Sequence, residues 1–254
     1  MRGIAGKAFA RGMNVVLLNQ RNCGGTEHLN AGLFHSGLTA DAKCVIDELE
    51  RIDDITAIAV AGYSLGGNLA LKLAGEYGDN APRGLRAVAA VSPILEIGEC
   101  VKALEKPGNF LYQWNFVRDL KARMRRKDKF RPGLFDLSRL KDVRTVRDFD
   151  EVYTAPHFGF AGAEDYYHRA SAMRVIDRVR VPALIITSED DPFVPSQPFR
   201  DPKVTGNPSI TLRLSPHGGH CGFVGPKTAD DDGYWAETQI VDFVARAMDG
   251  VKTG

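Results

Sequence analysis

A serine stands inside the segment Gly62-Tyr63-Ser64-Leu65-Gly66, and its hydroxyl is the first candidate for chemistry in this sequence. An apolar run at residues 57–61 precedes the segment, and a helix-like stretch at residues 68–74 follows it. Two glycines in a sharp turn from strand to helix would hold the hydroxyl out over a sheet edge as a nucleophile, with the Leu65 N–H facing a developing oxyanion. The alternative is an ordinary turn in which the serine only caps the helix. The order of strand, turn and helix favours the nucleophile.

A nucleophilic serine needs a base, and two histidines near the end of the chain compete for that role. Both lie in the segment 215–223, which follows the last apolar run. His220 follows Gly219 on a loop that is loose enough to reach across the edge of a sheet. His217 comes directly after Pro216 and fits a structural partner better. The sequence therefore predicts His220 as the base.

The base needs a group to orient it, and three acidic residues stand on the turn after the preceding apolar run. Asp191 is followed by a proline and an apolar residue, which is the usual setting for such a carboxylate. Asp190 is the second candidate and Glu189 the third. The sequence therefore predicts a triad of Ser64, Asp191 and His220.

Metal binding is the other chemistry that the histidine loop offers. His217, His220 and Cys221 place three donors within five residues, but helical spacing and a fourth ligand are both missing. No metal and no other cofactor is expected. Cys23, in a glycine-rich turn, and Cys221 are both predicted as packing residues.

Composition excludes several classes of protein. The chain has 254 residues, of which 44% are hydrophobic. Its formal net charge is +1, so the overall charge points neither to nucleic acid nor to an acidic membrane. The cysteines are dispersed, and neither a membrane-spanning run nor a signal peptide is visible. These features favour a cytoplasmic protein, and they leave its oligomeric state open.

Apolar runs alternate with amphipathic helical patterns over most of the chain, which predicts an α/β fold with a mainly parallel sheet covered by helices on both faces. The strand-like runs are residues 14–19, 56–63, 85–92, 183–187 and 210–214. The helical patterns are residues 2–11, 40–52 (with Thr39 as N-cap), 67–77 and 236–248.

The alternation stops between residues 95 and 174, a stretch that contains helical segments, aromatic residues and a basic run from Arg123 to Arg131. We expect this stretch to be a helical lid inserted into a core of residues 1–94 and 175–254. The basic run is predicted as a solvated helix face, with contact to phosphate headgroups at a membrane surface as the alternative.

Four motifs together resemble the α/β-hydrolase superfamily and, more narrowly, its YheT-like (AB hydrolase-4) family of presumed esterases. They are residues 18–26 (LNQRNCGGT), 62–68 (GYSLGGN), 188–193 (SEDDPF) and 217–223 (HGGHCGF). The order serine, acid, histidine is the α/β-hydrolase order. The resemblance runs from end to end and implies hydrolysis of carboxylic esters by Ser64, Asp191 and His220. Relatives also act on lipid acyl esters or transfer acyl groups to alcohols.

The chain departs from this family pattern at its beginning. The resemblance implies upstream strands and a His-Gly loop that supplies a second oxyanion donor, a donor worth about 2.7–4 kcal/mol. The sequence starts inside the helix that should follow them, at residues 2–11. We therefore expect missing N-terminal strands, through truncation or a strand supplied by a partner. A gap with exposed apolar surface and unpaired backbone is expected between residues 14–19 and 56–63.

Three functions follow from the sequence. The first is a serine esterase that acts on lipid or medium-chain acyl esters through an acyl-enzyme. The second is an alcohol O-acyltransferase that uses the same acyl-enzyme. The third is a hydrolase-like binding protein that is catalytically impaired because its site is incomplete.

Overall fold

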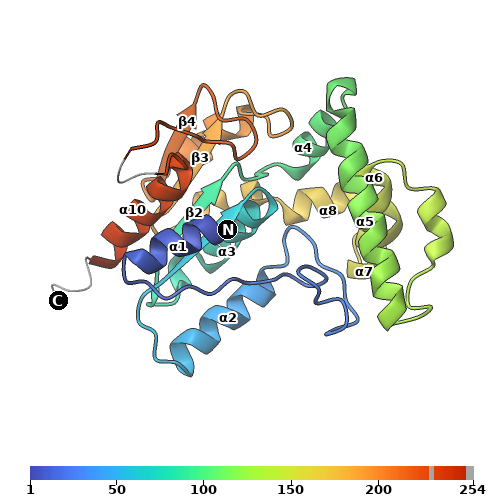
Figure 1. Cartoon of the computed structure of the whole chain (residues 1–254), viewed down its shortest axis with the longest axis horizontal. Helices are drawn as coiled ribbons and strands as arrows, with labels where there is room; N and C mark the ends of the chain where they lie inside the picture. The colour runs from blue at the N-terminus through green and yellow to red at the C-terminus, as the bar shows by residue number, and fades with distance from the viewer. Residues whose placement is uncertain (229–231, 250–254) are drawn as a thin grey trace. The chain divides into compact units, whose positions relative to one another are not determined.

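The fold is built on a sheet of four parallel strands in the order β1-β2-β3-β4 (Figure 1). The computed structural model describes residues 1–228 and 232–249 of the chain. Its strands match four of the five predicted runs, and they are β1 (Ile58–Tyr63), β2 (Leu85–Val91), β3 (Ala183–Ser188) and β4 (Ile210–Ser215). β3 is buried along its whole length and β2 along all but one residue, as expected for parallel strands with helices on both faces.

Two compact units make up the chain. The first contains the sheet and comprises Met1–Leu17, Ser36–Leu95 and Ser171–Gly254. The second comprises Leu18–His35 and Glu96–Ala170.

The helices of the first unit cover opposite faces of its sheet. They are α1 (Arg2–Ala10), α2 (Thr39–Arg51), α3 (Leu65–Tyr77), the short α9 (Pro202–Thr205) and α10 (Trp235–Asp249). α3 packs on β1 and β2, where Gly67 approaches Ala90. α10 packs on the other face, where Ile240 and Val244 join Ala89 in one apolar core. Adjacent residues of β2 serve opposite faces because strand side chains alternate.

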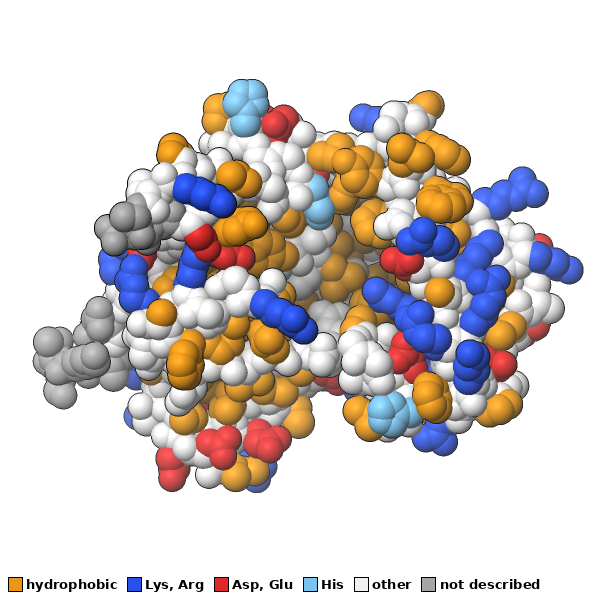
Figure 2. Space-filling model, viewed as in Figure 1, with side chains coloured by type: hydrophobic (Ala, Val, Ile, Leu, Met, Phe, Trp, Pro, Cys, Tyr) orange, Lys and Arg blue, Asp and Glu red, His pale blue; other side chains and the backbone are white. Residues whose placement is uncertain are grey.

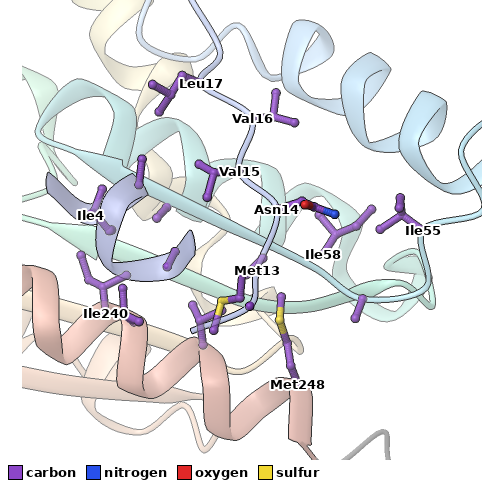
Figure 3. Close-up of a pocket in the computed structure, with 18 of the residues that line it drawn as sticks. Ile4, Met13, Asn14, Val15, Val16, Leu17, Ile55, Ile58, Ile240 and Met248 are labelled. Atoms are coloured by element: carbon purple, nitrogen blue, oxygen red, sulfur yellow. The ribbon is translucent and has the colours of Figure 1, made fainter. Parts of the chain in front are cut away.

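Residues 14–19 form no strand, so that prediction was wrong. A strand needs a partner with which to exchange backbone hydrogen bonds, and residues 13–17 have none in the sheet. A groove of about 400 Å³ separates these residues from β1 (Figure 3). Its lining is almost wholly apolar and includes Ile4, Met13, Val15, Ile58, Ile240 and Met248.

The groove leaves one side of the sheet open. β1 is an edge strand, so the backbone groups on its side away from β2 face the groove without a sheet partner. The facing segment is also exposed, with Val16 at 60% and Leu17 at 50%. The sequence placed a gap at this position, between residues 14–19 and the strand that begins near residue 56.

The second unit is helical. It contains α4 (Ile97–Leu104), α5 (Phe110–Phe130), α6 (Val146–Phe149), α7 (Ala155–Phe158) and α8 (Ala163–Ala170). Val117 and Met124 of α5 pack in an apolar core with Phe149 and Tyr153.

The segment Leu18–His35 belongs to this second unit, whereas the sequence assigned it to the core of residues 1–94. The buried ammonium group of Lys127 explains the difference. Its Nζ donates to Asn22 Oδ1 at 2.8 Å, to the Glu27 carbonyl oxygen at 3.1 Å and to the carbonyl oxygen of Asn30. A buried lysine needs partners of this kind, so the segment is held against α5 by contacts far apart in sequence.

Helix ends differ slightly from their predicted positions. α1 ends at Ala10 rather than at residue 11, and α2 begins at Thr39 with Leu38 as its N-cap. The hydroxyl of Thr39 donates to Glu76 Oε2 instead of capping the helix. Among the described residues, no helix combines the length and apolar character that crossing a bilayer requires.

Candidate active site

Ser64 occupies the turn between β1 and α3. Its backbone has φ +52° and ψ −115°, a conformation that is rare and costly for a residue with a side chain. Backbone hydrogen bonds hold it there. The Ser64 N–H donates to Val91 O at 2.8 Å, and Ser64 O accepts from the N–H groups of Asn68 at 3.0 Å and Ile94 at 3.4 Å. A strained serine held from both sides is the arrangement that presents its hydroxyl above a sheet.

The two glycines of the turn are not equivalent, although the sequence suggested that both were needed. A Cβ on Gly62 would collide with the backbone carbonyl group of Gly66. A Cβ on Gly66 would meet nothing within 4 Å. Gly67 is the second constrained position, since a Cβ there would lie 3.0 Å from Pro93 Cβ.

This asymmetry gives a matched pair of variants. We expect Gly62→Ala to lower the free energy of unfolding by about 2–3 kcal/mol, because the collision is with backbone that cannot move aside cheaply. Gly66→Ala, inside a helix, should leave stability unchanged or raise it by up to about 1 kcal/mol. Urea unfolding of the two variants and of the unmodified chain measures both changes in the free energy of unfolding. Equal destabilisation by the two substitutions would contradict the difference between Gly62 and Gly66.

His220 lies between Ser64 and Asp191. Its Nε2 is 3.0 Å from Ser64 Oγ, and its Nδ1 is 2.8 Å from Asp191 Oδ2. With the ring proton on Nδ1, the imidazole donates to the carboxylate and accepts from the serine hydroxyl. The three residues that the sequence grouped as a triad are therefore connected in space: His220 lies within hydrogen-bonding distance of both Ser64 and Asp191.

Asp191 is held rigidly. Its side chain is fully buried, and its Oδ1 accepts from the N–H groups of Phe193 at 3.1 Å and Val194 at 2.9 Å. The ring of Phe193 also packs against the imidazole of His220, with 4.2 Å between centroids. The apolar residue after the proline thus shields the hydrogen bond between Asp191 and His220 from water.

Asp190 and His217, the second candidates for acid and base, pair with each other instead. His217 Nδ1 lies 3.3 Å from Asp190 Oδ2, and the His217 side chain is 90% exposed. Asp190 Oδ1 accepts from the N–H of Gly219 at 2.8 Å, which lowers the pKa of Asp190. Ser188 Oγ donates to Gly219 O at 2.9 Å. The side chains of Asp190 and Ser188 therefore both hold the backbone of Gly219, the residue before His220.

Ser188 and Ser92 support the site and were not singled out from the sequence. Ser92 is fully buried, has φ +43°, and its Oγ accepts from the N–H of Cys221 at 3.3 Å. Each serine stands at or just past the end of a buried apolar strand. A serine at the end of a buried apolar strand is the sequence pattern by which both residues could have been predicted.

The pKa of His220 is raised to about 9. Burial is the largest single influence and lowers this pKa, but the hydrogen bond that the ring donates to Asp191 and the interactions with Cys221 together raise it by more. An imidazole in this setting is a stronger base than a free one.

Leu65 is the first residue of α3, so its N–H is one of the donors that a helix leaves unsatisfied at its start. This position agrees with the oxyanion donor that the sequence predicts, and the role itself stays a prediction. Glu189, the third acidic candidate, pairs with Arg200 and takes no part in this cluster.

Among the described residues, no three acidic, histidine or cysteine side chains are grouped so as to hold a metal ion. The Nδ1 atoms of His217 and His220 face aspartate oxygens instead. Cys23 is half-buried, and burial raises the pKa of its thiol, which makes it a poor nucleophile.

Comparisons with known proteins add family and fold. A family model described as alpha/beta hydrolase fold matches residues 2–225. YheT of Escherichia coli (strain K12), provisionally named an esterase, is 34% identical over 249 residues, which cover 97% of this chain and 72% of YheT. The medium-chain fatty acid ethyl ester synthase/esterase 2 of Saccharomyces cerevisiae is 29% identical over 259 residues, covering 91% of this chain and 55% of that protein.

A solved structure agrees on the fold. The monoacylglycerol lipase of Paleococcus ferrophilus superposes with a TM-score of 0.54 at 16% identity, over 96% of this chain and 88% of that one. The sheet, the helices, the family model and the relatives all indicate the same fold. The chain therefore belongs to the α/β-hydrolase family, in its YheT-like branch.

Proposed function

We propose that this chain is a serine esterase in which Ser64 is the nucleophile, His220 the general base, and Asp191 the group that orients the imidazole. One observation carries the proposal: His220 contacts Ser64 Oγ with one ring nitrogen and a buried carboxylate with the other. Names of relatives that include esterases support the reaction class. The roles of the three residues follow from their chemistry.

The reaction would proceed in two halves. His220 Nε2 takes the hydroxyl proton as Ser64 Oγ attacks the ester carbonyl carbon, and the Leu65 N–H donates to the oxyanion that forms. The protonated imidazole then gives its proton to the leaving alkoxide, which departs as an alcohol and leaves an acyl-enzyme on Ser64. In the second half His220 activates a water molecule, which attacks the acyl-enzyme and releases the carboxylic acid.

We propose medium-chain or lipid acyl esters as the substrates. The yeast relative is named a medium-chain fatty acid ethyl ester synthase/esterase, and this name supports the acyl part. A series of p-nitrophenyl esters from acetyl to palmitoyl tests it, with kcat/KM expected to peak at an intermediate chain length. A maximum at the acetyl ester would reject this substrate class.

Acyl transfer is the second candidate, because the same yeast name describes an ester synthase as well as an esterase. An alcohol would replace water in the second half of the reaction and yield a new ester. Incubation of the chain with a p-nitrophenyl ester and excess ethanol separates the two. Ethyl ester in the products indicates transfer, and free acid alone indicates hydrolysis.

Covalent labelling tests the nucleophile directly. A fluorophosphonate probe should modify Ser64 of the folded chain, and peptide mass mapping locates the adduct. Labelling that is absent, or that falls on another serine, would reject the proposed role of Ser64 whatever the natural substrate is.

The raised pKa of His220 gives a pH prediction. Only the neutral imidazole can accept the serine proton, and the folded pKa is about 9. We therefore expect kcat/KM to rise about tenfold per pH unit below pH 9 and to level off above it, since kcat/KM reports the free enzyme. Initial rates on a p-nitrophenyl ester, corrected for spontaneous hydrolysis at each pH, measure this. A midpoint at or below 6.5, the ordinary value for histidine, would contradict it.

A further inference from the structure

α5 carries a row of side chains beside the face that packs into its unit. Val117, Met124 and Lys127 of this helix are buried. Successive side chains are rotated by about 100° around a helix axis, so a different set of six falls together on a neighbouring side. Five of the six are exposed, and Lys121 is half-buried. We name this set the α5 stripe, and it consists of Leu111, Trp114, Arg118, Lys121, Arg125 and Lys129.

The amino-terminal end of the α5 stripe is apolar and exposed. Leu111 keeps 73% of its surface accessible and Trp114 keeps 52%, and their neighbours Phe110 and Tyr112 keep 64% and 48%. Figure 2 shows hydrophobic side chains gathered where α5 begins in Figure 1. Exposed apolar residues scattered singly need no explanation, but a contiguous group that includes tryptophan marks a contact surface.

The rest of the α5 stripe is cationic. From Arg118 to Phe130 the helix carries seven lysine and arginine residues and two aspartates. Arg118 contacts Asp119 and lies over the ring of Trp114, with 5.1 Å from its guanidinium carbon to the ring centroid. Figure 2 shows lysine and arginine side chains along this part of the helix.

Three of these cations have no counter-ion in the part of the chain that the structure describes. Arg126 pairs with Glu27, and Lys127 is turned inward, but Lys121, Arg125 and Lys129 make no ion pair there. They stand four residues apart on one side of the helix, where like charges repel and destabilise it. An external anionic surface would turn that repulsion into attraction.

We propose that the α5 stripe docks on a membrane surface that contains anionic phospholipid. Its cations pair with lipid phosphates, and Leu111 and Trp114 enter the boundary between headgroups and acyl chains. An acidic soluble protein would satisfy the cations but would leave the exposed apolar end without a partner. A membrane satisfies both ends of the same stripe, which is why we favour it.

The docking is independent of the proposed esterase activity, because the α5 stripe contains none of the residues assigned to that reaction. Vesicle sedimentation tests it with the whole chain. We expect the protein to sediment with vesicles of phosphatidylcholine and phosphatidylglycerol, to remain in solution with vesicles of phosphatidylcholine alone, and to be released by salt. Equal binding to both kinds of vesicle, or to neither, would overturn the proposal.

Two triple variants with the same change in net charge locate the contact. Lys121→Glu with Arg125→Glu and Lys129→Glu should lower the partition coefficient on the order of 100-fold, since each cation near an anionic surface contributes about fivefold. The control reverses three exposed cations of the first unit and should lose far less; its changes are Arg2→Glu, Arg51→Glu and Lys203→Glu. Equal losses in both variants would mean that net charge, rather than the stripe, drives binding.

Tryptophan fluorescence tests the apolar end. The chain has two tryptophans, so Trp235→Phe leaves Trp114 as the only reporter. Its emission should shift to shorter wavelength on addition of phosphatidylglycerol vesicles, because the indole leaves water. A response to poly-L-glutamate but not to vesicles would overturn the proposal and assign the stripe to an acidic protein.

Discussion

Ester hydrolysis should fall by about a million-fold, below detection, when Ser64 is replaced by alanine. The hydroxyl is the atom group that forms the acyl-enzyme, and neither His220 nor the Leu65 N–H can substitute for it. Ser64 has a strained φ of +52°, and alanine pays a similar cost for that conformation as serine does. We therefore expect stability to change little while kcat collapses, which separates a chemical effect from a folding effect.

Ser138→Ala is the matched control, since Ser138 is exposed and lies in the second unit. It should retain full activity on p-nitrophenyl esters, and circular dichroism should show all three proteins equally folded. If Ser64→Ala hydrolysed p-nitrophenyl esters as fast as the unmodified chain, the proposed serine esterase would be rejected. Turnover absent from the unmodified chain as well would favour the impaired, hydrolase-like binding protein.

The second large effect on kcat is expected at Asp191, and the adjacent Asp190 provides its control. Asp191→Asn should lower kcat about 10⁴-fold, because an amide can hold the imidazole only in the wrong tautomer and cannot stabilise its charge. Its oxygen can still accept from the N–H groups of Phe193 and Val194, so the turn should remain folded.

Asp190→Asn removes one charge from the neighbouring position and should lower kcat by less than about tenfold, since an exposed pair of this kind contributes little. Its amide oxygen can still accept from the N–H of Gly219. Steady-state kinetics on one p-nitrophenyl ester measure both variants. If Asp190→Asn proved the more damaging of the two, the assignment of the orienting acid would have to be exchanged.

Much of the first unit could be predicted from local pattern. β2 and β3 are continuous apolar runs because both faces of the sheet are covered, and α10 carries one apolar side because only that side meets the sheet. The residues of the candidate site could be named because each follows the end of a strand. Parallel strands bring such ends to one edge of the sheet.

The remaining features depend on contacts between distant parts of the chain, which local pattern does not contain. Residues 14–19 read as a strand, yet a strand exists only where a neighbour pairs with it, and β1 lies across the groove. The placement of Leu18–His35 in the second unit depends on the buried ammonium group of Lys127, which reads in sequence as one more charge in a basic run. Likewise, Gly66 has room for a side chain only because no atom of the folded chain lies within 4 Å of where its Cβ would be.

The position of Glu96–Ala170 between β2 and β3 has a consequence for the order of folding. β1 and β2 pair directly and are joined by a connection that contains α3, and the turn between β1 and α3 contains Ser64. Asp191 joins them only when β3 pairs with β2, across a much longer connection that contains most of the second unit, and His220 also requires β4 to pair with β3. Closing a longer loop costs only logarithmically more entropy but slows the search. We therefore expect the turn of Ser64 to form before Asp191 and His220 reach it, and the pairing of β3 with β2 to be the slow step.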